Sequence, residues 1–113
     1  MTDVEREVIL PATPAQVWEE FADPERLGEW FGAEVDGEIA EGEILRFDGE
    51  RAVVERADPA RRLTFRYLGD DTSRVDITID EIPDGSIVRV VERRIESAVT
   101  PRPQIGFKAL AKL

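Results

Sequence analysis

The chain has 113 residues with 15 basic and 25 acidic side chains, a formal net charge of −10, and neither cysteine nor histidine. These absences exclude disulfides, a cysteine nucleophile, a Ser-His-Asp triad and thiolate or imidazole metal sites, although an oxygen-only Mg²⁺ or Ca²⁺ site stays open. An acidic surface repels phosphate backbones and anionic lipid, so we expect no nucleic-acid or membrane partner.

Length and apolar content predict one domain over residues 1–113. Domains commonly run about 100–150 residues, and the apolar fraction of 42% suits a globular core. No window approaches the roughly 18 apolar residues of a transmembrane helix. The first six residues lack the apolar stretch of a signal peptide. We therefore expect a cytoplasmic protein.

The chain begins with a predicted strand and a capped helix. Residues 4–10 alternate in a way that is typical of a strand. Thr13 and Gln16 have the spacing of a capping box, and Pro14 occupies the first helical position. This helix is predicted to end near Phe21.

A second short helix and a long run of strands follow. The second helix is predicted to have Asp23 as its N-terminal cap and to end at about Phe31, where Gly32 stops it. Turn sequences such as Asp48-Gly49 then separate about six antiparallel strands. The predicted strands cover residues 33–39, 44–47, 51–57, 63–67, 75–80 and 86–93.

The tail predicts a short final helix. Pro101 and Pro103 prevent a helix from starting before about Gln104, and residues 104–113 place Phe107 on one apolar side. A helix of this length is marginal unless it docks on the rest of the chain. The element order is an α+β plan in which this helix covers an antiparallel sheet and the helical pair closes one end.

Several segments, taken together, resemble the START-like (SRPBCC) superfamily, and most of all its branch of homologues of the activator of heat-shock-protein-90 ATPase. The resemblance covers about residues 4–93 in order. The segments that carry it are residues 4–8, 14–18 with Val17-Trp18, 23–27 with Asp-Pro-Glu-Arg-Leu, Trp30-Phe31, 42–47 and 59–65.

The resemblance implies a helix-grip fold, in which a curved antiparallel sheet wraps a long C-terminal helix and leaves a cavity for an apolar ligand. Here the predicted final helix is short, either naturally or because the chain is cut. The cavity is then open, small or closed by a second copy of the chain, so a homodimer is one expectation.

The candidate ligand-binding residues are mainly apolar side chains expected to face that cavity. Each has a structural alternative, because the same positions would build a core in any globular protein. Trp30 lies at the cavity mouth in one interpretation and anchors its helix in the other. The other apolar candidates are Phe47, Phe65, Ile77, Val90 and Phe107.

Two polar residues complete the candidate site. Tyr67 shares a strand face with Phe65, and a buried phenol needs a hydrogen-bond partner. Glu92 follows Val90 at strand spacing, so it either points inward or is solvated where the strand leaves the core. An inward carboxylate is costly unless it is paired, for which Arg66 or Arg46 is available.

These observations leave three functions open. The first is binding of an apolar small molecule between the sheet and the C-terminal helix, without catalytic residues, metal or cofactor. The second is a chaperone-cofactor-like protein-interaction domain, for which basic islands such as Arg61-Arg62 and Arg93-Arg94 offer a docking surface for an acidic partner. The third is a polyketide cyclase or hydrolase, which would have to work with Tyr67, Glu92 and arginine side chains. Because no catalytic constellation is recognisable, an enzyme is the least favoured of the three functions.

Overall fold

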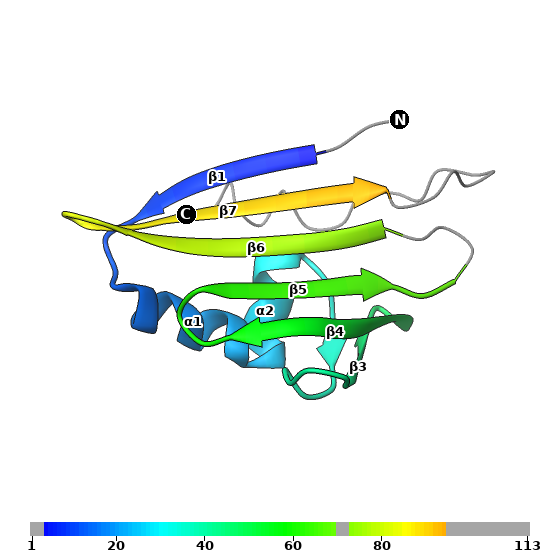
Figure 1. Cartoon of the computed structure of the whole chain (residues 1–113). Coiled ribbons are helices and arrows are strands. Elements are labelled where there is room, and N and C mark those ends of the chain that lie inside the picture. Colours follow the sequence, from blue (N-terminus) through cyan, green and yellow to red (C-terminus); the bar gives the residue numbers. More distant parts are fainter. Residues whose placement is uncertain (1–3, 70–72, 95–113) are drawn as a thin grey trace.

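One antiparallel sheet of seven strands, with two helices on one of its faces, makes up the described chain (Figure 1). The computed structural model describes residues 4–69 and 73–94. The elements are β1 (Val4–Leu10), α1 (Pro14–Ala22), α2 (Pro24–Phe31), β2 (Val35–Asp36), β3 (Ile44–Phe47), β4 (Glu50–Asp58), β5 (Arg62–Tyr67), β6 (Ser73–Ile82) and β7 (Gly85–Arg94).

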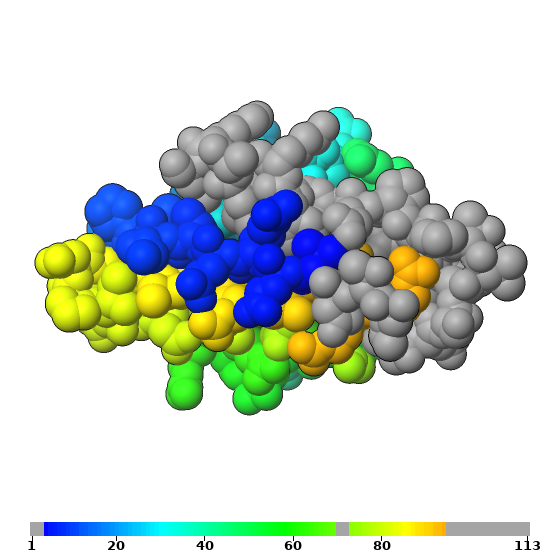
Figure 2. All heavy atoms as spheres, turned by 90° about the horizontal axis from the view of Figure 1, so that it is seen from above, coloured from blue at the N-terminus to red at the C-terminus, as the bar shows by residue number. Residues whose placement is uncertain are grey.

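The strands from β2 to β7 follow one another as a meander, and β1 completes the sheet at the far side of β7. The order across the sheet is β1-β7-β6-β5-β4-β3-β2. Figure 2 shows the atoms of β1, in blue, lying along those of β7, in yellow and orange. Because β1 and β2 are edges, the curved sheet stays open. This arrangement confirms the predicted α+β class, with two short helices between the first strand and an antiparallel meander. The final helix expected over residues 104–113 lies outside the described residues.

Both helices begin and end within one residue of the predicted positions. The Thr13 hydroxyl accepts a hydrogen bond from the Gln16 backbone N–H at 3.2 Å, and the Gln16 side chain accepts one from the Thr13 N–H at 2.9 Å. Asp23 caps α2 by accepting from the Glu25 N–H at 3.0 Å. The helix stops at Gly32, whose φ of 62° is left-handed and costs glycine little.

The segment after α2 is less extended than the sequence pattern predicts. The pattern predicts a strand over residues 33–39, but β2 covers two residues, which pair with Phe47 and Arg46 of β3. Gly37 then adopts a φ of 126°, and its Cα lies against Leu45, so close that an added Cβ would be 2.9 Å from the leucine side chain. Residues 33–39 do alternate between apolar and polar types. The backbone nevertheless turns away from β3 after Asp36, so the pairing stops there.

A bulge in β4 changes which side chains face outward. Val54 pairs with Phe65, yet the next pair joins Arg56 to Thr64, so Glu55 is an extra residue. Val54 is buried and Ala57 packs against the core, while Glu55 and Arg56 are both exposed. The bulge therefore directs two consecutive charged side chains to the outer face of the sheet.

The core lies between the helices and the face of the sheet that they cover, which we call the inner face. Strand alternation supplies it, because alternate residues are buried along β3, β5 and β7, at Ala52 and Val54 of β4, and from Ser73 to Ile79 of β6. The largest side chains that are fully enclosed are Phe21, Leu27, Leu45, Phe47, Leu63, Phe65, Tyr67 and Ile77.

Candidate functional site

Four aromatic side chains from three elements meet on the inner face. Phe31 of α2 has its ring centroid 6.0 Å from Phe47 of β3 and 5.8 Å from Phe65 of β5. Phe47 and Phe65 stack at 4.8 Å. Tyr67, one inward position further along β5, meets Phe47 and Phe65 edge-on at 5.6 and 5.8 Å. These separations are those of attractive aromatic pairs. We call Phe31, Phe47, Phe65 and Tyr67 the aromatic cluster.

The structure thus brings three of the sequence-predicted residues, Phe47, Phe65 and Tyr67, into mutual contact. It adds Phe31, which the sequence pattern places on the second helix without assigning it to the site. Trp30 is buried as well, but its ring packs against Phe21 of α1, with the centroids 4.7 Å apart. This contact agrees with Trp30 as an anchor between the two helices.

Two further candidates form an apolar row beside the aromatic cluster. Ile77 of β6 pairs directly with Val90 of β7, and on its other side it pairs with Leu63 of β5. All three side chains are buried. The row continues the apolar lining of the inner face from the aromatic cluster toward β7.

Glu92 points to the inner face. It alternates with the buried Val88 and Val90, and the residue is 8% exposed. The Ser73 hydroxyl of β6 donates a hydrogen bond to a Glu92 carboxylate oxygen at 3.2 Å. Sequence reasoning missed Ser73, although its position two residues before the buried Val75 indicates the same face.

The arginines proposed as partners of Glu92 have other positions. The Arg66 Nε is 2.9 Å from a Glu55 carboxylate oxygen on the outer face. Arg46 is exposed on β3. Both arginines occupy strand positions that alternate with buried residues, so they point away from the inner face. Phe107, the last candidate, lies outside the described residues.

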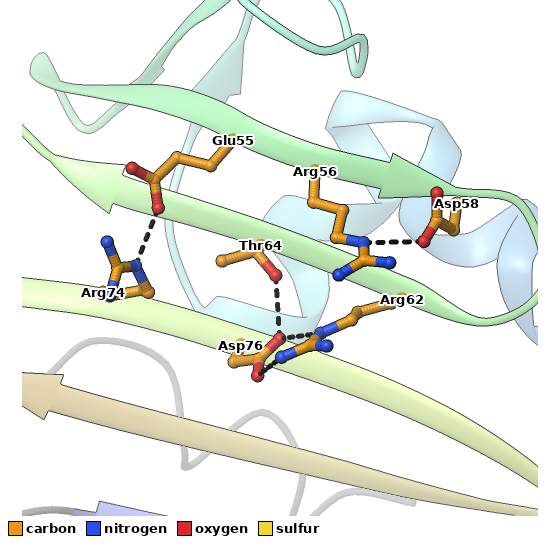
Figure 3. Close-up of polar contacts among 7 residues, drawn as sticks. All are labelled: Glu55, Arg56, Asp58, Arg62, Thr64, Arg74 and Asp76. Carbon is orange, nitrogen blue, oxygen red and sulfur yellow. Dashed lines mark hydrogen bonds and ion pairs between the residues drawn. The ribbon is translucent and has the colours of Figure 1, made fainter.

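The outer face carries a network of ion pairs (Figure 3). Arg62 contacts Asp76 through two hydrogen bonds of 2.8 and 2.5 Å, and the Thr64 hydroxyl donates to the same carboxylate at 2.8 Å. Partial burial raises the pKa of Asp76, but the hydrogen bonds from Arg62 and Thr64 outweigh it, so this pKa lies below its ordinary value.

The bulge residue Glu55 joins two arginines in the same network. Arg74 donates to it at 2.7 Å and Arg66 at 2.9 Å. The hydrogen bond from Arg74 is the main cause that holds the pKa of Glu55 below its ordinary value. A hollow of about 430 Å³ lies next to Arg74, and we call it the basic hollow. It is lined by Arg62, Arg74, Asp76, Val91, Arg93 and Arg94.

An open cleft of opposite charge lies where α2 meets β2. Its volume is about 940 Å³, and its charged lining residues are Glu25, Glu29, Glu34, Asp36 and Asp48. Within residues 4–69 and 73–94, no group of three or more acidic side chains is placed to hold a metal ion. The same described residues contain no helix that is both long and apolar enough to cross a membrane.

Comparisons with known proteins place this geometry in a family. A family model described as polyketide cyclase/dehydrase and lipid transport matches residues 1–112. CalU16 from Micromonospora echinospora superposes with a TM-score of 0.72 and is 26% identical, over 84% of this chain and 62% of that one. The chain thus spans less than two thirds of CalU16. No curated protein matches the chain significantly.

Two more distant solved structures share the fold. BH1534 from Bacillus halodurans is 20% identical, with a TM-score of 0.74 over 99% of this chain and 84% of its own. The Aha1 dimer from Colwellia psychrerythraea is 15% identical, with a TM-score of 0.71 over 88% of this chain and 81% of its own. These likenesses agree with the helix-grip architecture of an open curved sheet carrying two helices.

Proposed function

This chain belongs to the polyketide cyclase/dehydrase and lipid-transport family, and from that premise we propose that it binds an apolar small molecule against the inner face of its sheet. The observation that carries the proposal is the aromatic cluster. Phe31, Phe47, Phe65 and Tyr67 converge from α2, β3 and β5 on one side of the sheet. Binding sites for small molecules are mostly apolar and aromatic, with a few polar groups that fix orientation.

The remaining candidates extend this proposed wall. Ile77 and Val90 continue the apolar surface across β6 and β7, and Glu92 supplies a buried polar group at one end. We propose Trp30 and Phe107 as further contacts, from α2 and from the tail. The proposed ligand lies between the inner face and the C-terminal segment.

Native mass spectrometry of the purified chain, repeated after denaturation, tests this function. We expect an excess mass that disappears on denaturation and identifies the class of the retained molecule. The same spectrum tests our proposal that two copies pair, which the dimeric state of the Aha1 neighbour supports. A monomer at every concentration would contradict the pairing.

Two variants of one strand test where the molecule binds. Phe47→Leu removes a ring from the inner face, whereas Ile44→Leu changes a 41% exposed side chain of the same strand. We expect Phe47→Leu to weaken binding of the retained molecule by about three- to tenfold, since a factor of ten is 1.4 kcal/mol. Ile44→Leu should leave binding unchanged. Equal affinities in both variants would overturn the inner-face site.

The basic hollow favours a second candidate function, docking of an acidic protein segment. Four arginines line it on a chain whose net charge is −10. Calorimetry with poly-glutamate at low salt tests it, and Arg94→Gln should reduce any binding that salt also reduces. Binding that is indifferent to salt and to Arg94→Gln would remove this candidate.

A further inference from the structure

We infer that the ligand enters through the open cleft between α2 and β2, and that this entrance favours ligands with a neutral or cationic end over anions. The inference rests on the proposed function, because it concerns the entry and the class of the same ligand. Two observations carry it: the thin wall between this cleft and the aromatic cluster, and the carboxylates around the cleft. We call the opening the acidic cleft.

The acidic cleft lies directly outside the aromatic cluster. Val35 of β2 lines the cleft and is paired with Phe47 of the cluster. Gly28 of α2 lines it as well, about one helical turn before Phe31. All four rings of the cluster are buried, so a ligand reaches them only when part of their surroundings moves. The cleft, with a volume of about 940 Å³, is open to solvent at that place.

The wall between cleft and cluster is thin because α2 contributes no side chain at Gly28. A Cβ added to Gly28 would be 3.4 Å from the Cγ2 of Val35 and would clash with the Ala33 carbonyl oxygen. The backbone of α2 therefore contacts the chain before β2 directly, and Val35 supplies a side chain at the contact. Shortening Val35 would open a passage from the cleft toward Phe47.

The wall of the cleft on the β2 side is residues 33–36, which we call the gate segment. Its neighbours Gly32 and Gly37 adopt left-handed φ values of 62° and 126°. β2 is an edge strand and covers two residues, so few backbone bonds hold the segment to the sheet. Elements that open for ligands are drawn from such weakly held regions, and residues at their ends absorb the change in backbone angles.

The hydrogen bonds of the gate segment indicate where it separates. The Asp48 N–H donates to the Glu34 carbonyl at 2.8 Å, and the Glu34 N–H donates to an Asp48 carboxylate oxygen at 2.8 Å. These two bonds tie the segment to the turn between β3 and β4. Toward α2, the Ala33 N–H donates to the Gly28 carbonyl at 3.0 Å. The gate therefore opens between α2 and the segment, by loss of this bond at the end of the helix.

The acidic cleft carries negative charge that is not paired locally. Arg46 lies opposite Asp36 in the strand register, but the two side chains form no ion pair. On the outer face, by contrast, carboxylates such as Asp76 are paired with arginines. Within residues 4–69 and 73–94, the cleft carboxylates that make neither a hydrogen bond nor an ion pair are those of Glu25, Glu29, Glu34 and Asp36.

This charge selects among ligands that approach the entrance. A cleft lined by one sign of charge concentrates the opposite charge and raises the rate at which it associates. An anion is repelled before it reaches the gate segment. The ligand that fits both parts has an apolar body for the inner face and a neutral or cationic end that stays in the acidic cleft.

Three probes on one aromatic skeleton test the selection by charge: 2-naphthaleneethanol, 2-naphthylethylamine and 2-naphthylacetate. At neutral pH they are neutral, cationic and anionic, and stopped-flow naphthalene fluorescence with the full chain gives their entry and exit rates. At low salt we expect the amine to enter at least about tenfold faster than the acetate, with the alcohol between them. In about 1 M salt, where the screening length is about 3 Å, the ratio should fall to about twofold or less.

Two double variants show whether the acidic cleft causes this ratio. Glu29→Gln with Glu34→Gln removes two charges from the cleft. Glu19→Gln with Glu81→Gln removes two charges from exposed residues that do not line it, so the net charge of the chain changes equally. We expect the first pair to lower the amine-to-acetate ratio of entry rates by at least about threefold and the second to leave it nearly unchanged. Equal changes in both would overturn the entrance.

Val35→Ala tests the gate itself. We expect it to speed both entry and exit of the neutral probe by at least about threefold while the affinity stays within about twofold, because a gate changes the barrier and not its two ends. Val88→Ala, the same change at a buried residue of β7 that does not line the cleft, should not speed them in parallel. Parallel acceleration in both variants would mean general loosening of the fold and no gate at Val35.

The outcomes separate this inference from the proposed function. If the probes bind but their entry rates respond neither to the cleft charges nor to Val35→Ala, the entrance is wrong and the apolar site stands. If none of the three probes binds, the apolar site fails and the inference fails with it. Should Val35→Ala not fold, as judged by circular dichroism, the two double variants still decide.

Discussion

The two faces of the sheet are built from the same strands but held by different forces. The inner face packs aromatic and aliphatic side chains that are almost completely enclosed. The outer face carries arginines and carboxylates in pairs that remain partly hydrated; the side chains of Arg62 and Asp76, for example, are 39% and 26% exposed. Burial of apolar area is the stronger contribution, because exposed ion pairs gain little over their hydrated state.

The comparison teaches where each face can tolerate change. A substitution on the inner face removes contacts that no solvent molecule replaces. On the outer face, water and neighbouring charged side chains can replace the contacts that a substitution removes. The effects on stability should therefore fall steeply from the aromatic cluster, through the half-buried Asp76, to the exposed pairs of β1 and β7.

The largest effect is expected from Phe65→Ala. Phe65 has no exposed surface and contacts three other rings of the aromatic cluster. Its truncation should lower the free energy of unfolding by about 3–5 kcal/mol, because burial is lost and a cavity remains. Urea unfolding measures this, with Thr78→Ala on the outer face as control, at about 0.5 kcal/mol or less. Similar losses for the two variants would show that the faces do not differ as described.

Asp76→Asn should have the next largest effect, because it weakens the contacts to Arg62 and Thr64. We expect a loss of about 1–2 kcal/mol, as is usual for hydrogen bonds to a charged group that is partly solvated.

The same variant gives a pH dependence with a defined sign. The pKa of Asp76 in the folded chain lies below its ordinary value of 3.8. The carboxylate thus stabilises the fold above that value, and this stabilisation is lost as pH falls through the folded pKa. The stability difference between the unaltered chain and Asp76→Asn should be constant near neutrality and shrink in strong acid. A difference that grew on acidification would contradict this assignment.

A smaller effect is expected at the start of α1, which belongs to neither face of the sheet. Thr13→Ala removes the hydroxyl that accepts from the Gln16 N–H. Loss of such a cap costs about 1 kcal/mol. Thr13→Ser, which retains the hydroxyl, is the matched control and should restore most of the loss in thermal unfolding.

The smallest effect is expected from Arg89→Gln. Arg89 contacts Glu7 at 2.6 Å and Glu5 at 3.3 Å, but the side chains of all three are well exposed. We expect no measurable change in the urea midpoint at moderate salt, since such pairs are screened and cost side-chain entropy. A clear loss of stability here would mean that the outer network acts as a unit.

Local sequence rules predicted most of the fold. The capping box at Thr13, the stop at Gly32 and the alternation of β5 and β6 depend on neighbouring residues, so the sequence determines them directly. The length of β2 and the bulge at Glu55 depend on how distant strands meet. The alternation of apolar and polar residues in these two segments would look the same if β2 were longer or the bulge were absent.

For the candidate site, the sequence predicted which face of the sheet a side chain points to better than it predicted which residues that side chain contacts. Alternation placed Phe65 and Tyr67 on one face, but it left Glu92 either inward or solvated and did not show which residue approaches it. Ser73 does so because the β6–β7 register places it diagonally across from the carboxylate. Register over residues far apart in sequence is a property of the folded sheet.

The pairing of β1 with β7 has a consequence for synthesis of the chain. Val4 lies opposite Glu92 and Leu10 opposite Ser86, so the first strand has its partner nearly at the other end of the described chain. Contacts this distant in sequence form slowly, and during translation β1 must wait until β7 has left the ribosome. Throughout that wait its backbone groups can pair with other chains. The charges of Glu5, Arg6 and Glu7 disfavour such pairing.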